Sequence, residues 1–168
     1  YYVNKSSLPK VYGGFNTSLS WKGFDLSAIF AYSIGGYIYN RDITMILHNG
    51  SLEGRDWSTE ILKRWTPENR YTDVPALSTT SNNWNSASTR FLQNNSYMRL
   101  KNLTLSYDLP KQWISKLALS SVQVFVQGDN LFTIHRNQGL DPEQGITGIT
   151  YYRYPAMRTI SGGINLSF

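Results

Sequence analysis

The stretch TISGGINLSF, residues 159–168, has the most regular alternation in this chain, and it decides the fold class. One face is apolar or glycine throughout: Ile160, Gly162, Ile164, Leu166 and Phe168. The opposite face is small or polar: Thr159, Ser161, Gly163, Asn165 and Ser167. Because successive side chains of a strand point to opposite faces, this pattern predicts a β-strand between an apolar and a polar environment.

Four earlier segments alternate in the same way, at residues 15–21, 24–33, 96–109 and 122–129. The first two are separated only by Lys22-Gly23, which predicts a tight antiparallel hairpin. The sequence therefore predicts five strands.

The segment at 96–109 does not keep its phase. Leu103 and Leu105 lie on its apolar face, but the same alternation continued upstream would put Arg99 and Lys101 on that face. A β-bulge or a segment above the membrane would each explain the change, and the sequence leaves both open.

The connections between these segments are alternately short and long. A two-residue turn is followed by a long polar stretch at 35–95, a short connection near Pro110, and a second long stretch at 135–158. Transmembrane barrels have short periplasmic turns and long extracellular loops. We therefore predict an all-β, antiparallel transmembrane β-barrel segment with two long extracellular loops, the first containing a short helix at 58–65.

Five strands cannot close such a barrel, because single-chain bacterial barrels have an even number of strands, starting from about eight. Residues 1–12 show no signal-peptide pattern. We expect residues 1–168 to be the C-terminal part of one barrel domain, without its plug and N-terminal strands. A barrel shared by several chains is the alternative.

Composition supports a membrane barrel. Only 16% of the residues are charged, against about 25% in an average soluble domain, and 14% are aromatic. The chain has no Cys, and no apolar run long enough for a membrane-spanning helix. The net charge is +5, but the 16 Lys and Arg are scattered, so we expect no nucleic-acid binding.

Six motifs in order along the chain resemble the end of SusC/RagA-type TonB-linked outer-membrane proteins. They are PKVYGGF (9–15), KGFDL (22–26), SYMRLKNL (96–103), NLF (130–132), GLDPE (139–143) and YP (154–155). The resemblance implies a large plugged barrel in the Gram-negative outer membrane that imports oligosaccharides, peptides or similar nutrients. It also implies partnership with a SusD-type surface lipoprotein and with the TonB complex, the latter through an N-terminal segment that does not appear here.

The alternation divides the predicted strands into a lipid face and a lumen face. The expected lipid face includes Phe24, Leu26, Phe30, Leu103, Leu105, Val124, Val126, Ile164 and Leu166. The expected lumen face includes Asn16, Asp25, Thr104, Gln123 and Asn165. The apolar positions of the last strand, which are Ile160, Gly162, Ile164, Leu166 and Phe168, resemble the signal that the barrel-assembly machinery recognises in its clients.

Candidate contact residues lie in the first long loop, where Trp57, Trp65 and Trp84 could bind a ligand or the lipoprotein or could simply pin the loop. Asp141 and Glu143 could suggest a cation or acid-base site, but we interpret them as part of a loop motif. His48 and His135 are expected to be solvated. We predict no enzyme activity, catalytic residue, cofactor or metal.

Two other classes of protein remain open. A passive porin or adhesin barrel would share the strand pattern but lack a plug and energy coupling. A soluble carbohydrate-binding β-sandwich predicts that the apolar face of 24–32 packs on a second sheet.

Overall fold

The computed structural model describes residues 3–48, 54–78, 86–114, 119–139, 141–143, 145, 147–150 and 152–168. The chain divides into two compact units, each described here by itself. The loop unit comprises Tyr1–Leu8, Tyr37–Asn94 and Gln144–Arg153. The wall unit comprises Pro9–Gly36, Asn95–Glu143 and Tyr154–Phe168.

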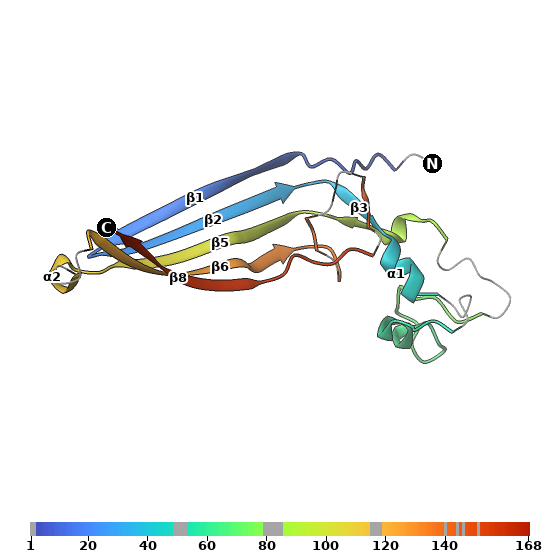
Figure 1. Ribbon diagram of the computed structural model, residues 1–168. Coiled ribbons are helices and arrows are strands. Elements are labelled where there is room, and N and C mark those ends of the chain that lie inside the picture. Colours follow the sequence, from blue (N-terminus) through green and yellow to red (C-terminus); the bar gives the residue numbers. More distant parts are fainter. Residues whose placement is uncertain are drawn as a thin grey trace. The chain divides into compact units, whose positions relative to one another are not determined.

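The wall unit is one antiparallel sheet of five strands in the order β1-β2-β5-β6-β8 (Figure 1). The strands are β1 (Val11–Trp21), β2 (Phe24–Ile34), β5 (Tyr97–Asp108), β6 (Ser121–His135) and β8 (Thr159–Ser167). All five predicted strands are confirmed, although β1 begins earlier and β6 continues six residues beyond the predicted end at 129. A short helix, α2 (Lys111–Ile114), lies in the connection that follows β5.

The hairpin between β1 and β2 turns at Lys22 and Gly23, whose φ angles are 49° and 87°. Two positive φ angles in a two-residue loop match the twist of the flanking strands. The turn therefore holds Trp21 opposite Phe24 and sets the register of the whole β1–β2 pair.

Cross-strand pairing assembles the apolar positions into continuous rows. Phe24 pairs with Tyr107, Tyr107 with Val124, and Val124 with Ile164. These side chains remain open to the surroundings; Ile164, for example, is 62% exposed. Phe24 and Leu26 are also exposed, at 44% and 39%, which contradicts the sandwich alternative, because a second sheet would cover them.

The phase change in β5 is a bulge. Ile29 pairs with Asn102 and Phe30 with Leu100, so Lys101 is the extra residue between them. The bulge reverses the alternation, so Leu100 joins the apolar face of Phe30 and Arg99 turns to the polar face. Of the two explanations left open by the sequence, the structure supports the bulge.

The loop unit contains more structure than its sequence predicted. In it, β3 (Tyr37–Asn40) lies between β4 (Leu92–Asn94), antiparallel, and β7 (Ile149–Thr150), parallel. Its helices are α1 (Arg41–Ile46) and the 3₁₀ helices η1 (Thr59–Lys63) and η3 (Thr89–Phe91). These strands, of two to four residues each, are too short to show an alternation, so the sequence predicted this stretch only as a long loop with a short helix.

Local side-chain caps and a small apolar core hold the loop unit together. Asn40 Oδ1 accepts a hydrogen bond from the Ile43 N–H (3.0 Å) and so begins α1, and Ser58 caps η1 through the Glu60 N–H. The predicted helix at 58–65 is thus present as a shorter 3₁₀ helix. Ile38 and Phe91 are each 1% exposed and form the centre of the core. Among the described residues, no helix is long and apolar enough to cross a membrane.

Candidate functional site: a buried ion-pair cluster on the wall unit

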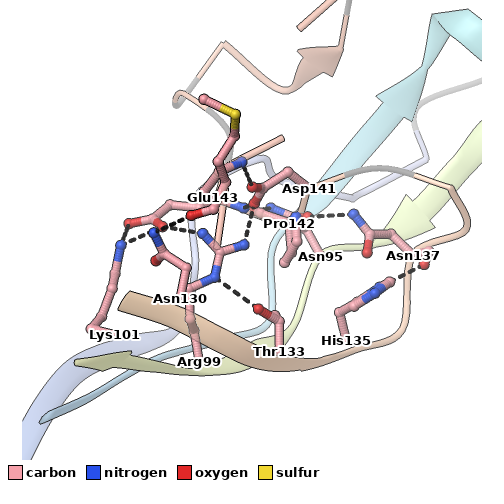
Figure 2. Close-up of polar contacts among 12 residues, drawn as sticks. Asn95, Arg99, Lys101, Asn130, Thr133, His135, Asn137, Asp141, Pro142 and Glu143 are labelled. Carbon is pink, nitrogen blue, oxygen red and sulfur yellow. Dashed lines mark hydrogen bonds and ion pairs between the residues drawn. The ribbon is translucent and has the colours of Figure 1, made fainter. Parts of the chain in front are cut away.

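Arg99 lies at the centre of a polar cluster on the wall unit (Figure 2). It is 3% exposed, although arginine is rarely buried without partners. Its Nε donates to Thr133 Oγ1 (2.8 Å), Nη1 to Glu143 Oε2 (2.7 Å) and Nη2 to Asp141 Oδ1 (2.5 Å). Each guanidinium nitrogen therefore has a different acceptor, an arrangement that a lysine could not reproduce.

The bulge explains how Arg99 reaches these partners. Arg99 pairs with Thr133 in the β5–β6 register, so the two side chains stand on the same face of the sheet. Without the extra residue Lys101, the alternation would place Arg99 on the apolar face. One inserted residue therefore creates the site.

Asp141 joins three segments of the chain. Its Oδ1 accepts from Arg99 on β5 and from the Glu143 N–H (2.9 Å), while its Oδ2 accepts from the Ala156 N–H (2.6 Å). Burial by itself would raise the pKa of the Asp141 carboxyl, but the two backbone N–H groups and Arg99 outweigh it and lower that pKa. Asp141 is therefore ionised at neutral pH.

Lys101 and Glu143 complete the cluster. Lys101 Nζ donates to both carboxylate oxygens of Glu143, at 2.6 and 2.5 Å. Both side chains are partly exposed, at 33% and 39%, whereas those of Arg99 and Asp141 are only 4% and 7% exposed. The two cations and two carboxylates balance, so the buried charges are compensated locally.

Side-chain amides extend the cluster along the same loop. Asn95 donates to the backbone oxygen of Pro142 (2.9 Å), and Asn137 donates to Asn95 Oδ1 (3.3 Å). His135 Nδ1 in turn hydrogen-bonds to the Asn137 backbone oxygen (2.8 Å). The loop that follows β6 is therefore attached to the wall at several points.

A cavity of about 320 Å³ lies beside the cluster. Its lining comes from β5, from β6, from residues that follow β6 and from the segment before β8: Arg99, Asn130, Phe132, Thr133, His135, Gly139, Asp141, Pro142, Pro155, Ala156 and Arg158. Because Arg99 and Asp141 line this cavity, a ligand inside it would meet the cluster.

The cluster is suited to a structural role, which is to hold the loop that follows β6 on the wall unit. Both carboxylates of the Asp141-Pro142-Glu143 motif accept from Arg or Lys, so their charge is already neutralised. No group of three or more metal-ligating side chains occurs in the part of the chain that the structure describes. The loop-motif interpretation of Asp141 and Glu143 therefore fits the geometry better than a cation site.

The predicted contact residues Trp57 and Trp65 are not part of this cluster. Trp57 and Trp65 both lie in the loop unit, 41% and 43% exposed, and Trp84 lies outside the described residues. Trp57 contacts His48 edge to face, with ring centroids 5.1 Å apart. His48 is fully buried, so the expectation that it is solvated was wrong, because this ring contact places it in the core of the loop unit.

The last strand carries its apolar face outward. In β8, Ile160 is 76% exposed and Leu166 52%, and Phe168 just beyond the strand is 93% exposed. Gly162 and Ile164 occupy the same alternation, paired with Val126 and Val124. The structure places all five predicted residues in line, and their role in assembly stays a prediction.

Sequence reasoning missed Arg99 and Lys101 as members of a site. The signal was present in the phase change at these two residues, which place positive charges where the alternation expects apolar side chains. Nothing local in the sequence, however, connects them with carboxylates about forty residues downstream.

Comparison with known proteins gives consistent matches. No family model matches the chain. Two proteins of Formosa agariphila, the TonB-dependent receptors P3 and P26, are 33% and 30% identical to it over 92% and 97% of its length. The TonB-dependent receptor SusC of Bacteroides thetaiotaomicron is 27% identical over 99% of the chain. The chain spans only 16% to 17% of the length of these relatives.

Solved structures give the same picture. Structures of the RagAB peptide importer in its "closed-closed" and "open-open" states match 99% of the chain, with a TM-score of 0.86 and 35% identity. The match covers 18% of those chains. The antiparallel barrel-wall assignment is confirmed by this likeness, and none of the names of these relatives describes an enzyme.

Proposed function

Because the chain belongs to the SusC/RagA-type TonB-linked outer-membrane proteins, we propose that it forms wall and external loops of a TonB-dependent importer. The whole protein would take up oligosaccharides, peptides or similar nutrients across the outer membrane. It would act with a SusD-type surface lipoprotein, and with the TonB complex through parts of the protein outside this chain.

One observation carries the proposal: the wall unit has an exposed apolar face and a polar face, in a sheet that matches an importer over almost every residue. The apolar face requires lipid, since a surface of this kind exposed to water would associate or aggregate. The polar face would then line the route of the nutrient.

The polar face carries two groups of hydrogen-bonded side chains suited to contact with water. Asn102 donates to Asp129 Oδ1 (2.8 Å), and Gln127 donates to both oxygens of the same carboxylate. Asn165 donates to Gln123, and Gln123 to Asp108. Such a surface would tolerate passing polar solutes without binding them tightly.

The last strand and the loop tryptophans complete the proposal. Ile160, Gly162, Ile164, Leu166 and Phe168 would be read by the barrel-assembly machinery through an unpaired strand edge. Trp57 and Trp65 would contact the lipoprotein or the nutrient, because both are half exposed in the loop unit and aromatic side chains dominate contact hot spots.

The experiment uses the full-length parent protein in its own cell. We expect it in the outer-membrane fraction, as a compact band that shifts on heating, with uptake that stops when TonB is removed. Deletion of Phe168 should reduce the amount of compact band. A soluble parent protein, or uptake that continues without TonB, would overturn the importer and in the second case favour a passive porin.

A further inference from the structure

The strand β6 is longer than its partner β8. Pairing between them ends at Asp129 and Thr159, while β6 stays paired with β5 as far as His135. Over Leu131 to His135, the edge of β6 that faces away from β5 therefore has no strand partner within the described residues. Such an edge presents backbone N–H and C=O groups to an added extended chain.

The cavity beside the ion-pair cluster lies along this open edge. Phe132, Thr133 and His135 of β6 line it, together with Pro155 and Ala156. Pro155 has no backbone N–H, and the Ala156 N–H already donates to Asp141. Neither residue therefore has a free backbone N–H to donate to the edge of β6. We call this space the edge groove.

The groove offers a positive charge. Arg158 lines it and is exposed, and no acidic side chain among the described residues pairs with it. Asp141, the one carboxylate among the described lining residues, forms an ion pair with Arg99. An arginine in this setting suits a carboxylate, which it can bind with two parallel hydrogen bonds.

We propose that the edge groove binds the C-terminal end of a short peptide. The peptide backbone adds to β6 between Leu131 and His135, and its terminal carboxylate pairs with Arg158. This inference rests on the proposed import function and selects peptides from its substrate classes. A groove of about 320 Å³ is at the small end of ligand pockets, which suits the end of a chain.

The lining favours a peptide over a sugar. Sugar rings need broad aromatic faces, and the described lining contains no Trp or Tyr. Phe132, Pro142 and Pro155 instead provide apolar walls for a side chain, while the strand edge provides a backbone ladder. Arg158 would bind the terminal carboxylate of the peptide.

The test measures binding of an N-terminally labelled tripeptide to the purified full-length protein by fluorescence anisotropy. The same peptide with an amidated C-terminus is the ligand control. Arg158→Gln is the test variant, and Arg136→Gln, which removes an exposed positive charge outside the lining, is its matched control. The heat-shifted band is checked for every variant, so that a failure to fold is recognised.

We expect Arg158→Gln to raise the Kd of the free-acid peptide about tenfold or more, as loss of a charged hydrogen bond does, and Arg136→Gln to leave it unchanged. Amidation should weaken binding to the wild type and have little further effect in Arg158→Gln. Methylation of the peptide's backbone nitrogens should also weaken binding, because it removes ladder donors.

Three results would overturn the proposal: equal binding of acid and amide, an unchanged Kd in Arg158→Gln, or equally effective competition by inorganic phosphate. If any of these occurs while TonB-dependent uptake persists, the groove inference fails and the importer stands. If uptake does not depend on TonB, the importer fails whatever the groove binds.

Discussion

The wall unit and the loop unit reach stability by opposite means. The loop unit buries a small core, with Ile38 and Phe91 each 1% exposed and Val74 3% exposed. The wall unit leaves many large apolar side chains of its strands exposed, such as Leu19 at 67% and Ile160 at 76%, and its stability depends on strand pairing and on its surroundings. The loop unit buries its apolar side chains inside itself, whereas those of the wall unit would face lipid in the proposed barrel.

The wall unit also buries a charged side chain. Arg99 is 3% exposed, and the carboxylates that compensate its charge lie on a loop. Removal of water is stabilising for an apolar side chain and costly for a charge, unless the charge is paired. The comparison therefore predicts that the same type of substitution has different effects in the two units.

The largest effect is expected from Phe91→Ala in the loop unit. Loss of a large buried aromatic side chain costs about 3–5 kcal/mol in packing and cavity terms. Hydrogen exchange of the full-length protein should show faster exchange across β3 and β4, while the strands of the wall unit stay protected. Leu62→Ala, at a position 72% exposed, is the control. Equal loss of protection in both units would show that they are not separate.

A charge on the apolar face of the wall unit comes second. Leu103 pairs with Ala28 and Gly128 near the middle of the strands, so Leu103→Lys places an ammonium at about the depth of the lipid centre. The expected cost is about 2–4 kcal/mol. It is measured as the shift of the urea midpoint of the folded barrel in lipid vesicles. Thr104→Lys, on the polar face, should have a much smaller effect; similar effects would refute the face assignment.

The third prediction concerns the buried pair of Arg99 and Asp141. Asp141→Asn keeps the shape but removes the charge, and loss of a hydrogen bond between charged groups costs about 1.5–3 kcal/mol. The segment at 152–158 should become sensitive to protease in the full-length protein. Arg99→Lys should behave similarly, because the three acceptors are met by three separate guanidinium nitrogens, and a lysine has one compact ammonium in their place.

The same pair gives a pH dependence with a definite sign. The pKa of Asp141 is lowered in the folded protein, so its contribution is complete above the ordinary Asp value of about 3.9 and is lost as pH falls through the lowered pKa. The difference in protease sensitivity between wild type and Asp141→Asn should be constant from pH 5 to 8 and vanish in strong acid. A difference that already closes between pH 5 and 8 would contradict this assignment.

How much the sequence revealed differs between the units for a physical reason. Period-two alternation located all five strands of the wall unit, because one face of each strand is apolar over many residues. The alternation predicted the end of β6 at residue 129, because Asn130, with φ 52°, interrupts the regular strand geometry there. The pairing with β5 shows that the strand continues beyond it. In the loop unit, Tyr39 and Phe91 are more than fifty residues apart, and their rings, with centroids 6.2 Å apart, meet only through tertiary packing, which no local pattern records.

The candidate site shows the same limit. The carboxylates of Asp141 and Glu143 were recognised as a motif, but their partners Arg99 and Lys101 depend on a one-residue bulge and on a contact that spans about forty residues. Alternation can reveal that a phase changes, but it does not say which loop will meet the displaced side chain. That information resides in the register of β5 with β6.

The smallest effect is expected from removal of an ion pair that is about as short as those of the cluster but exposed. Lys63 and Glu60 are 2.8 Å apart in the loop unit, but their side chains are 67% and 51% exposed. Water and salt screen such a pair, and holding two long side chains together opposes the gain. Lys63→Ala should therefore leave protease sensitivity and hydrogen exchange of η1 unchanged, under conditions in which Asp141→Asn releases its segment. If Lys63→Ala proved the more disruptive of the two, burial would not be what distinguishes the ion pairs of the two units.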